Sequence, residues 1–253
     1  MPAARETPPW WLPAAWPAPA QVRAGITTRL GGGSRQKYTG FNLALHVGDE
    51  PSAVSANRVE LRQRLNLPQE PCWLQQIHGN HVVPAAEGPA QPADGSYTTS
   101  PGPVCTILVA DCVPLLLADF SGHQVAAIHA GWRGIAAGIV DAALAVMHAP
   151  PGQVLAWIGP CIGPNRYAVG AEVRSACLQM EPDAAECFQP TVRNHWRADL
   201  RRLVRTGLQR HGVGAIHDTD ICVYDKPEHF FSHRRDGQTG RMAALIWIDK
   251  DQP

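Results

Sequence analysis

The sequence contains no apolar run of the roughly 18–20 residues that a helix needs to cross a bilayer. Prolines interrupt its first 20 residues, which lack the unbroken apolar core of a signal peptide. Neither sign of charge dominates, because 22 basic and 22 acidic side chains balance. We therefore expect a cytoplasmic protein that binds neither nucleic acid nor membranes and whose partners are small molecules.

Two metal-binding patterns are also missing. No Cys-x-x-Cys pair occurs among the seven cysteines, so a closed structural zinc site lacks its usual support. No His-x-His pair occurs either, and multicopper oxidases need such pairs to hold a trinuclear copper cluster. The cysteines are odd in number and several lie in apolar, strand-like segments. We therefore expect reduced thiols rather than a disulfide framework.

The chain is long enough to bury a substantial core, and its composition of 45% hydrophobic and 17% charged residues is globular. Apolar patterning predicts strands at 21–29, 71–78, 104–111, 113–119, 124–130, 154–159, 215–224 and 241–248. Helical spacing predicts helices at 52–67 (with Ser52 as N-cap), 135–149, 171–180 and 198–212. Because strands and helices alternate without a clear linker, we expect one mixed α/β domain over residues 1–253.

Two histidines and one cysteine stand near the ends of apolar segments, beside residues that allow the chain to turn. They are His78 in QQIHGN, Cys112 in ADCVP and His129 in AIHAG. Imidazole and thiolate are zinc donors, and three ligands leave a fourth position open for water or substrate. Residue type alone also allows a Cys112–His129 nucleophile pair, or a buried cysteine with two hydrogen-bonded structural histidines. Metal content separates the first two, because bound zinc would quench the thiol nucleophile.

Basic residues beside turns are candidates for binding an anionic substrate. Arg29 precedes a glycine-rich loop at 31–34, whose free backbone N–H groups can form an anion-binding nest. Arg235 lies in the loop 232–241 with two further arginines, a composition that suits phosphate. Arg133 follows Trp132, whose ring can stack on a base. The alternatives are a flexible turn for the glycine loop and solvated salt bridges for the arginines.

Ten short motifs, taken together, closely resemble the YfiH family, also called the multicopper polyphenol oxidase (laccase-like) or peptidoglycan editing factor family. The motifs are WPAP, TTRLGGGS, FNLALHVGD, NR, QQIHGN, ADG, ADCVPLLLAD, AAIHAGWRG, IGPCIGP and FFSHRRDGQTGR. They run in this order from residue 16 to residue 241, so the resemblance covers nearly the whole chain. It implies a cytoplasmic zinc protein with layered sheets flanked by helices, a fold similar to the catalytic domain of cytotoxic necrotizing factor.

The resemblance also implies a site and an activity. It places the zinc ligands on His78, Cys112 and His129. It implies phosphorolysis of adenosine, inosine, guanosine and methylthioadenosine to base and ribose 1-phosphate, and also adenosine deamination. Cys112, His129 and Asp111, the nearest carboxylate for proton transfer, are then the expected catalytic residues. The expected substrate contacts, for phosphate and for nucleoside, are Arg29, Asn42, Gln76, Arg133 and Arg235.

Other functions stay open. The editing-factor name points to a Cys–His amide hydrolase acting on cell-wall precursors, and the necrotizing factor domain is itself a Cys–His deamidase. The laccase name points to polyphenol oxidation, which the missing His-x-His pairs oppose, although copper can occupy a His/Cys site in vitro. A non-catalytic zinc or nucleotide-binding protein is a further alternative. We expect a monomer or a weak homodimer.

Overall fold

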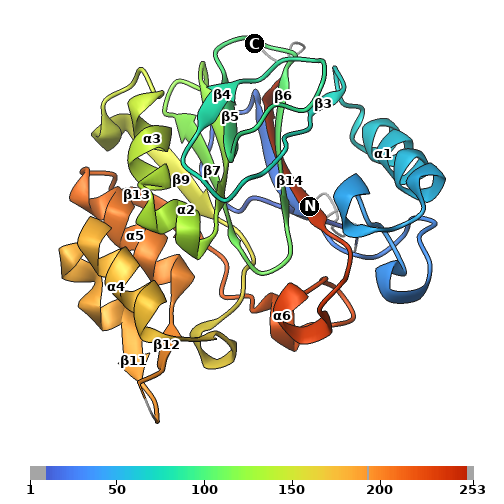
Figure 1. Ribbon diagram of the computed structural model, residues 1–253. Helices are drawn as coiled ribbons and strands as arrows, with labels where there is room; N and C mark the ends of the chain where they lie inside the picture. Colours follow the sequence, from blue (N-terminus) through green and yellow to red (C-terminus); the bar gives the residue numbers. More distant parts are fainter. Residues whose placement is uncertain (1–9, 193, 250–253) are drawn as a thin grey trace, which may run out of the picture.

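The computed structural model describes residues 10–192 and 194–249. Two mixed β-sheets pack face to face at its centre (Figure 1). The five-stranded sheet has the order β1 (Trp11–Pro13), β2 (Val22–Thr27), β14 (Met242–Ile248), β6 (Val104–Val109), β3 (Pro71–Cys72). The six-stranded sheet has the order β13 (Ala215–Asp218), β9 (Val154–Ile158), β7 (Val113–Asp119), β8 (Val125–Ala130), β5 (Gly95–Thr98), β4 (Val82–Pro84).

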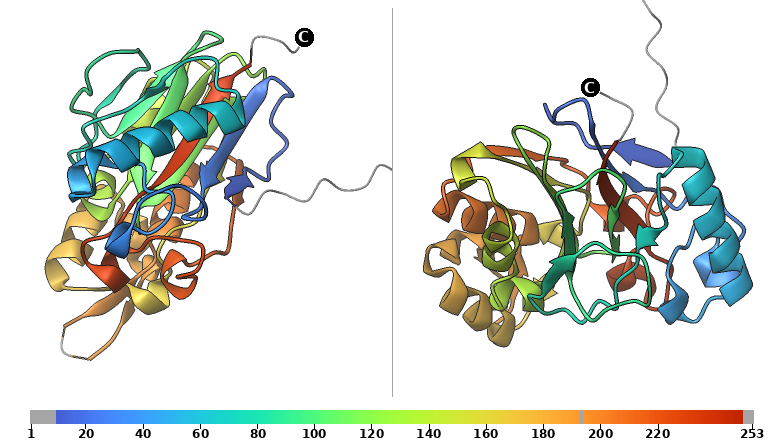
Figure 2. Two further views of the ribbon diagram at one scale, coloured as in Figure 1. Left: turned by 90° about the vertical axis from the view of Figure 1, so that its right-hand side faces the viewer. Right: turned by 90° about the horizontal axis from the view of Figure 1, so that it is seen from above.

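Helices cover the outer faces of both sheets, which gives four layers in the view from above (Figure 2). Helix α1 (Pro51–Leu65) lies against the five-stranded sheet. The six-stranded sheet is covered by α2 (Trp132–Ala136), α3 (Ile139–Ala145), α4 (Ala171–Met180) and α5 (Leu200–Arg210). A small sheet of β10 (Ala168–Val169), β12 (Trp196–Ala198) and β11 (Phe188–Pro190) extends beyond them, and α6 (His233–Asp236) precedes β14. The expected mixed α/β class is confirmed.

Successive side chains of the central strands point alternately to the two faces of a sheet, so each strand contributes to two layers of the core. In β7, Leu115 and Leu117 face the helices, whereas Leu116 between them faces the other sheet, and all three are fully buried. In β14, Ile246 lies between the sheets and Leu245 lies toward α1. Because both faces of each strand are covered, these strands are continuous apolar runs in the sequence. None of the helices in the described part combines the length and apolarity needed to cross a membrane.

Several predicted elements differ from the structure. The helix predicted at 135–149 is two helices, because Gly138 adopts φ +83° between α2 and α3. The strands predicted at 71–78 and 215–224 end early, at Cys72 and Asp218. Ser52 is not the N-cap of α1, since the helix begins at Pro51 behind Glu50. Apolar spacing shows which residues face a core but not where the backbone leaves regular geometry.

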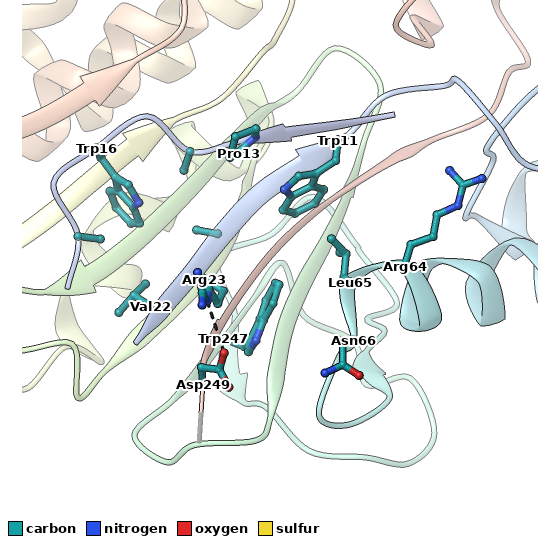
Figure 3. Close-up of a pocket in the computed structure, with 13 residues that line it drawn as sticks. Trp11, Pro13, Trp16, Val22, Arg23, Arg64, Leu65, Asn66, Trp247 and Asp249 are labelled. Carbon is teal, nitrogen blue, oxygen red and sulfur yellow. Dashed lines mark hydrogen bonds and ion pairs between the residues drawn. The ribbon is translucent and has the colours of Figure 1, made fainter. Parts of the chain in front are cut away.

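Strand β14 connects two hollows of the surface. Arg241, just before the strand, lines a cavity of about 350 Å³. Trp247 and Asp249, roughly 20 Å further along at about 3.4 Å per residue, line a groove of about 590 Å³. The groove lies between β1, β2 and the C-terminal end of α1, from which Leu65 points toward Trp11 (Figure 3).

Candidate metal centre and its cavity

The smaller cavity forms where the connection between β6 and β7 passes the end of β8. Val113 pairs with Ala130 in the antiparallel ladder, which places Cys112, before β7, opposite Gly131, after β8. His129 is the penultimate residue of β8, and His78 comes from the loop that follows β3. Three segments distant in sequence therefore meet at one wall of the cavity.

The predicted ligand triad converges at this wall. One ligand atom from each of His78, Cys112 and His129 lies within 4.8 Å of the other two. The imidazole rings meet edge to face with centroids 4.8 Å apart. Exposure is graded, since His78 is exposed, Cys112 is half-buried and His129 is buried. The cluster therefore has a protein-facing side and a side open to the cavity, and no other such cluster occurs among the described residues.

Gly131 allows the chain to pass against this cluster. A Cβ atom at this position would lie 3.0 Å from the Sγ of Cys112 and 3.0 Å from the Nδ1 of His78. Real Cβ atoms rarely come that close to a neighbour, so a side chain would push the two ligands apart. The glycine in the AAIHAGWRG motif is thus explained by close approach rather than by an unusual φ.

Asp94 ties the two histidines together. Its Oδ1 lies 2.8 Å from the Nδ1 of His129 and accepts the backbone N–H of His78 at 2.9 Å. Its Oδ2 accepts the backbone N–H groups of Gly79 at 2.7 Å and Ile77 at 3.2 Å. Burial by itself raises the pKa of Asp94, but these hydrogen bonds outweigh it and hold the pKa below its usual range. The carboxylate orients His129 so that its Nε2 is the nitrogen available to a metal.

The charge state of His129 follows from its neighbours. Burial lowers the pKa of this imidazole, but its interactions with Cys112 and Asp94 outweigh burial and raise it to about 9. Without a metal, His129 is therefore a buried imidazolium whose two neighbours are the Cys112 sulfur and the Asp94 carboxylate. A metal cation would take over the proton's place between nitrogen and sulfur, because imidazole and thiolate bind metals in their deprotonated forms.

Two residues at the site have strained backbones. His78 has φ +57° and Asp111 has φ +103°, values that side chains with a Cβ rarely adopt. The Asp111 carboxylate accepts the Ser232 hydroxyl at 2.6 Å and the Arg234 backbone N–H at 2.6 Å. These bonds join the β6–β7 connection to α6 across the cavity. Burial raises the pKa of Asp111, although the two hydrogen bonds act in the opposite direction.

The predicted substrate contacts divide into two groups. Gln76 and Arg133 line the cavity, although both polar atoms of the Gln76 side chain already bond to the backbone of Leu108. The other three residues do not line it. Arg29 donates to the carbonyls of Pro227 and Thr39, Asn42 is fully buried and bonds to Asp49, and Arg235 donates to the carbonyls of Val223, Tyr224 and Phe230. Their binding to substrate remains a prediction.

Arg235 is the residue of the arginine-rich segment 232–241 that the sequence analysis singles out, but the two other arginines of that segment, Arg234 and Arg241, are the ones that line the cavity. Tyr167, from the turn after β9, also lines it and has no role in the sequence analysis. The arginine-rich motif indicated the loop but not which of its guanidinium groups turns inward. Asp94 lies in the ADG motif, where nothing in the neighbouring sequence indicates that the carboxylate is buried.

The chain is similar to known proteins along nearly its whole length. A family model described as multi-copper polyphenol oxidoreductase laccase matches residues 23–249. A Pseudomonas aeruginosa protein named purine nucleoside phosphorylase is 44% identical over 239 residues, covering 94% of this chain and 98% of the relative. The Escherichia coli K12 protein named purine nucleoside phosphorylase YfiH is 42% identical, covering 92% of this chain and 96% of the relative.

Solved structures extend the similarity to the fold. A Neisseria meningitidis protein superposes with a TM-score of 0.92 at 43% identity, covering 95% of this chain and 99% of that one. YlmD from Geobacillus stearothermophilus gives a TM-score of 0.92 at 31% identity, covering 97% and 98%. Because the family model matches nearly the whole of this chain, the chain belongs to the multi-copper polyphenol oxidoreductase laccase family, which is the YfiH family that its motifs resemble.

Proposed function

We propose that the protein is a zinc-dependent purine nucleoside phosphorylase that also deaminates adenosine. Its substrates would be adenosine, inosine and guanosine, each converted with phosphate to the base and ribose 1-phosphate, and methylthioadenosine, converted to adenine and methylthioribose 1-phosphate. The names of the Pseudomonas and Escherichia relatives support the class of reaction. The observation that carries the proposal is one cavity that combines the His78–Cys112–His129 cluster with three arginines and two aromatic rings.

The donor set suits zinc. His78, Cys112 and His129 would hold the ion, and nitrogen and sulfur donors in a group of three are typical of catalytic zinc sites. When bound, the ion supplies a Lewis acid at the cavity wall. Copper oxidation by several linked copper ions is disfavoured, because the described residues form no second metal-ligand cluster beside this one.

The arginines suit the phosphate. Arg133, Arg234 and Arg241 line the cavity, where planar guanidinium groups can bind phosphate oxygens in pairs. Phosphorolysis forms a bond from a phosphate oxygen to C1′ as the bond from C1′ to N9 breaks. The departing purine keeps the bonding electrons and must gain a proton. Asp111 would handle that proton, a role supported by its position in the cavity wall and by burial, which raises its pKa.

Product analysis tests the proposal. Purified metal-loaded protein is incubated with each nucleoside, with and without inorganic phosphate, and products are separated by chromatography. We expect the base and the sugar 1-phosphate (ribose 1-phosphate, or methylthioribose 1-phosphate from methylthioadenosine) only when phosphate is present, and inosine from adenosine in either case. Failure to release any base from the four nucleosides in the presence of phosphate would overturn the phosphorylase assignment.

A Cys–His amide hydrolase is the second candidate. The Cys112 side chain hydrogen-bonds to His129, the pairing that thiol hydrolases use to activate a nucleophile. Chelation separates the two functions. A thiol hydrolase keeps its activity after zinc is removed with a chelator, whereas the phosphorylase proposed above loses its activity and regains it when zinc is restored.

A further inference from the structure

The ring of Trp132 faces the proposed substrate cavity under an arginine side chain. The guanidinium carbon of Arg133 lies 4.4 Å from the centroid of the Trp132 ring. Both residues line the cavity, and Trp132 also packs on the hydrophobic core beneath the helices. A flat aromatic surface of the size that stacks on a base is therefore present, and a cation lies over it.

Arg133 is held less firmly than the other arginines of the cavity. Arg234 donates to the carbonyl of Ala168 while lying 4.6 Å over the ring of Tyr167. Arg241 donates to the carbonyls of Thr239 and Gly240. Arg133 is exposed, and its guanidinium group makes no hydrogen bond or ion pair with the rest of the described chain. Contact with the Trp132 ring is what positions it.

We propose that Arg133 is a movable cover for a base-binding surface on Trp132, and that an oxyanion in the cavity draws it away. A charge-assisted, paired hydrogen bond to phosphate is stronger than an exposed cation–π contact, so the guanidinium group would leave the ring for the anion. The uncovered ring can then stack on a purine, an interaction that does not depend on the identity of the base. Phosphate and base would therefore bind with positive cooperativity.

The inference rests on the proposed function, because it takes phosphate and a purine as the ligands of this cavity. It adds a coupling between them that the phosphorylase assignment does not require. Linkage makes the coupling reciprocal: the factor by which phosphate tightens binding of the base equals the factor by which the base tightens binding of phosphate.

Calorimetric titration of the metal-loaded protein measures this coupling. Hypoxanthine is titrated without phosphate and with saturating inorganic phosphate, and potassium chloride keeps the ionic strength equal so that general screening is constant. We expect phosphate to lower the dissociation constant of hypoxanthine at least about fivefold, the lower end of typical couplings. The reverse titration should give the same factor.

Three variants distinguish a cover from a simple phosphate ligand. Arg133→Ala should tighten hypoxanthine binding in the absence of phosphate and bring the coupling factor to about one. Trp132→Leu should weaken hypoxanthine binding under both conditions. Arg174→Ala is the matched control, because Arg174 lies 5.4 Å over the ring of Trp196 and neither residue lines the cavity. It should keep the coupling of the unmodified protein.

The outcomes are separable. If phosphate does not change hypoxanthine binding while phosphorolysis proceeds, the cover is wrong and the proposed function stands. The same holds if Arg133→Ala weakens binding of the base in the absence of phosphate, since a cover predicts the opposite sign. If neither hypoxanthine nor phosphate binds and no nucleoside is cleaved, the proposed function itself fails.

Discussion

The two hollows at the ends of β14 differ in the chemical character of their linings, and their sizes do not indicate this difference. The groove beside Trp247 is the larger, about 590 Å³ against about 350 Å³, and three tryptophans contribute to its walls. Its charged pair, Arg23 and Asp249, is 3.4 Å apart with side chains 46% and 30% exposed. Among the residues that the structure describes, no histidine or cysteine lines it.

The smaller cavity has the opposite character. Asp94 is fully buried behind it, and His129 is 3% exposed. Exposed ion pairs contribute about 0–1 kcal/mol, because water screens them and the side chains remain mobile. Buried polar groups held by several hydrogen bonds keep a fixed geometry, which is what metal binding and catalysis require. Buried polar groups with a fixed orientation are therefore a better guide to the functional site than the volume of a hollow is.

Removing a ligand tests this difference most strongly. Cys112→Ala should abolish stoichiometric zinc binding, measured by elemental analysis, and lower phosphorolysis more than about 100-fold, beyond the losses typical of outer-shell changes. Cys222→Ala is the matched control, because Cys222 is also half-buried but lies outside the cavity. It should keep both metal and activity. Stoichiometric zinc in the Cys112 variant would show that the cluster is not the metal site.

The pH dependence of stability should reveal the buried imidazolium. The pKa of His129 is raised to about 9 in the folded metal-free protein from its ordinary value of 6.5. Its contribution is therefore fully present below pH 6.5 and is lost as the pH rises through 9. We expect chelator-treated protein to lose up to about 3 kcal/mol of unfolding free energy over this window, measured by urea denaturation. His129→Gln should remove this part of the pH dependence. An unchanged pH profile of stability in that variant would contradict the assignment of the effect to His129.

Asp94→Asn tests the residue that orients the histidines. The amide cannot accept all the N–H groups that the carboxylate accepts, so we expect zinc affinity to fall about 10- to 100-fold in competition with a chromophoric chelator. Asp119→Asn is the control. Asp119 is also buried and accepts the backbone N–H of Gln124, but it ends β7 far from Cys112. If both variants lose stability but neither loses zinc affinity, Asp94 is merely structural.

We expect the smallest effect on activity from a substitution in the groove. Trp16 is half-buried at the edge of the core between the sheets, so Trp16→Ala should lower stability. Phosphorolysis by the folded variant should stay within about twofold of the unmodified protein, as for changes distant from a site. A tenfold fall in kcat/KM would mean that the groove participates in the reaction, and the contrast between the hollows would no longer hold.

Much of the fold was predictable because its central strands are apolar on both faces. The runs at 104–111, 113–119 and 124–130 became β6, β7 and β8 with ends shifted by at most two residues. The break at Gly138 was not predictable, since apolar residues continue at helical spacing across it. The local apolar pattern indicates which residues are buried, but a change of φ at one residue does not alter that pattern.

The site was predictable in part for a different reason. Residue chemistry and the family motifs selected His78, Cys112 and His129, and these three do converge. The same reasoning chose Arg29, Asn42 and Arg235, whose side chains bond elsewhere. A motif indicates which loop is involved, but the direction of each side chain depends on partners contributed by other segments.

The sequence by itself determined the mixed α/β class, through its apolar strand and helix segments. Through residue chemistry together with the family motifs, it also determined which three side chains supply the nitrogen and sulfur atoms of the cluster. Only the tertiary structure decided that Asp94 holds both histidines. It also decided that Arg234 and Arg241, rather than Arg235, face the cavity. Such contacts join segments far apart along the chain, and only the pairing and packing of the sheets brings them within hydrogen-bonding distance.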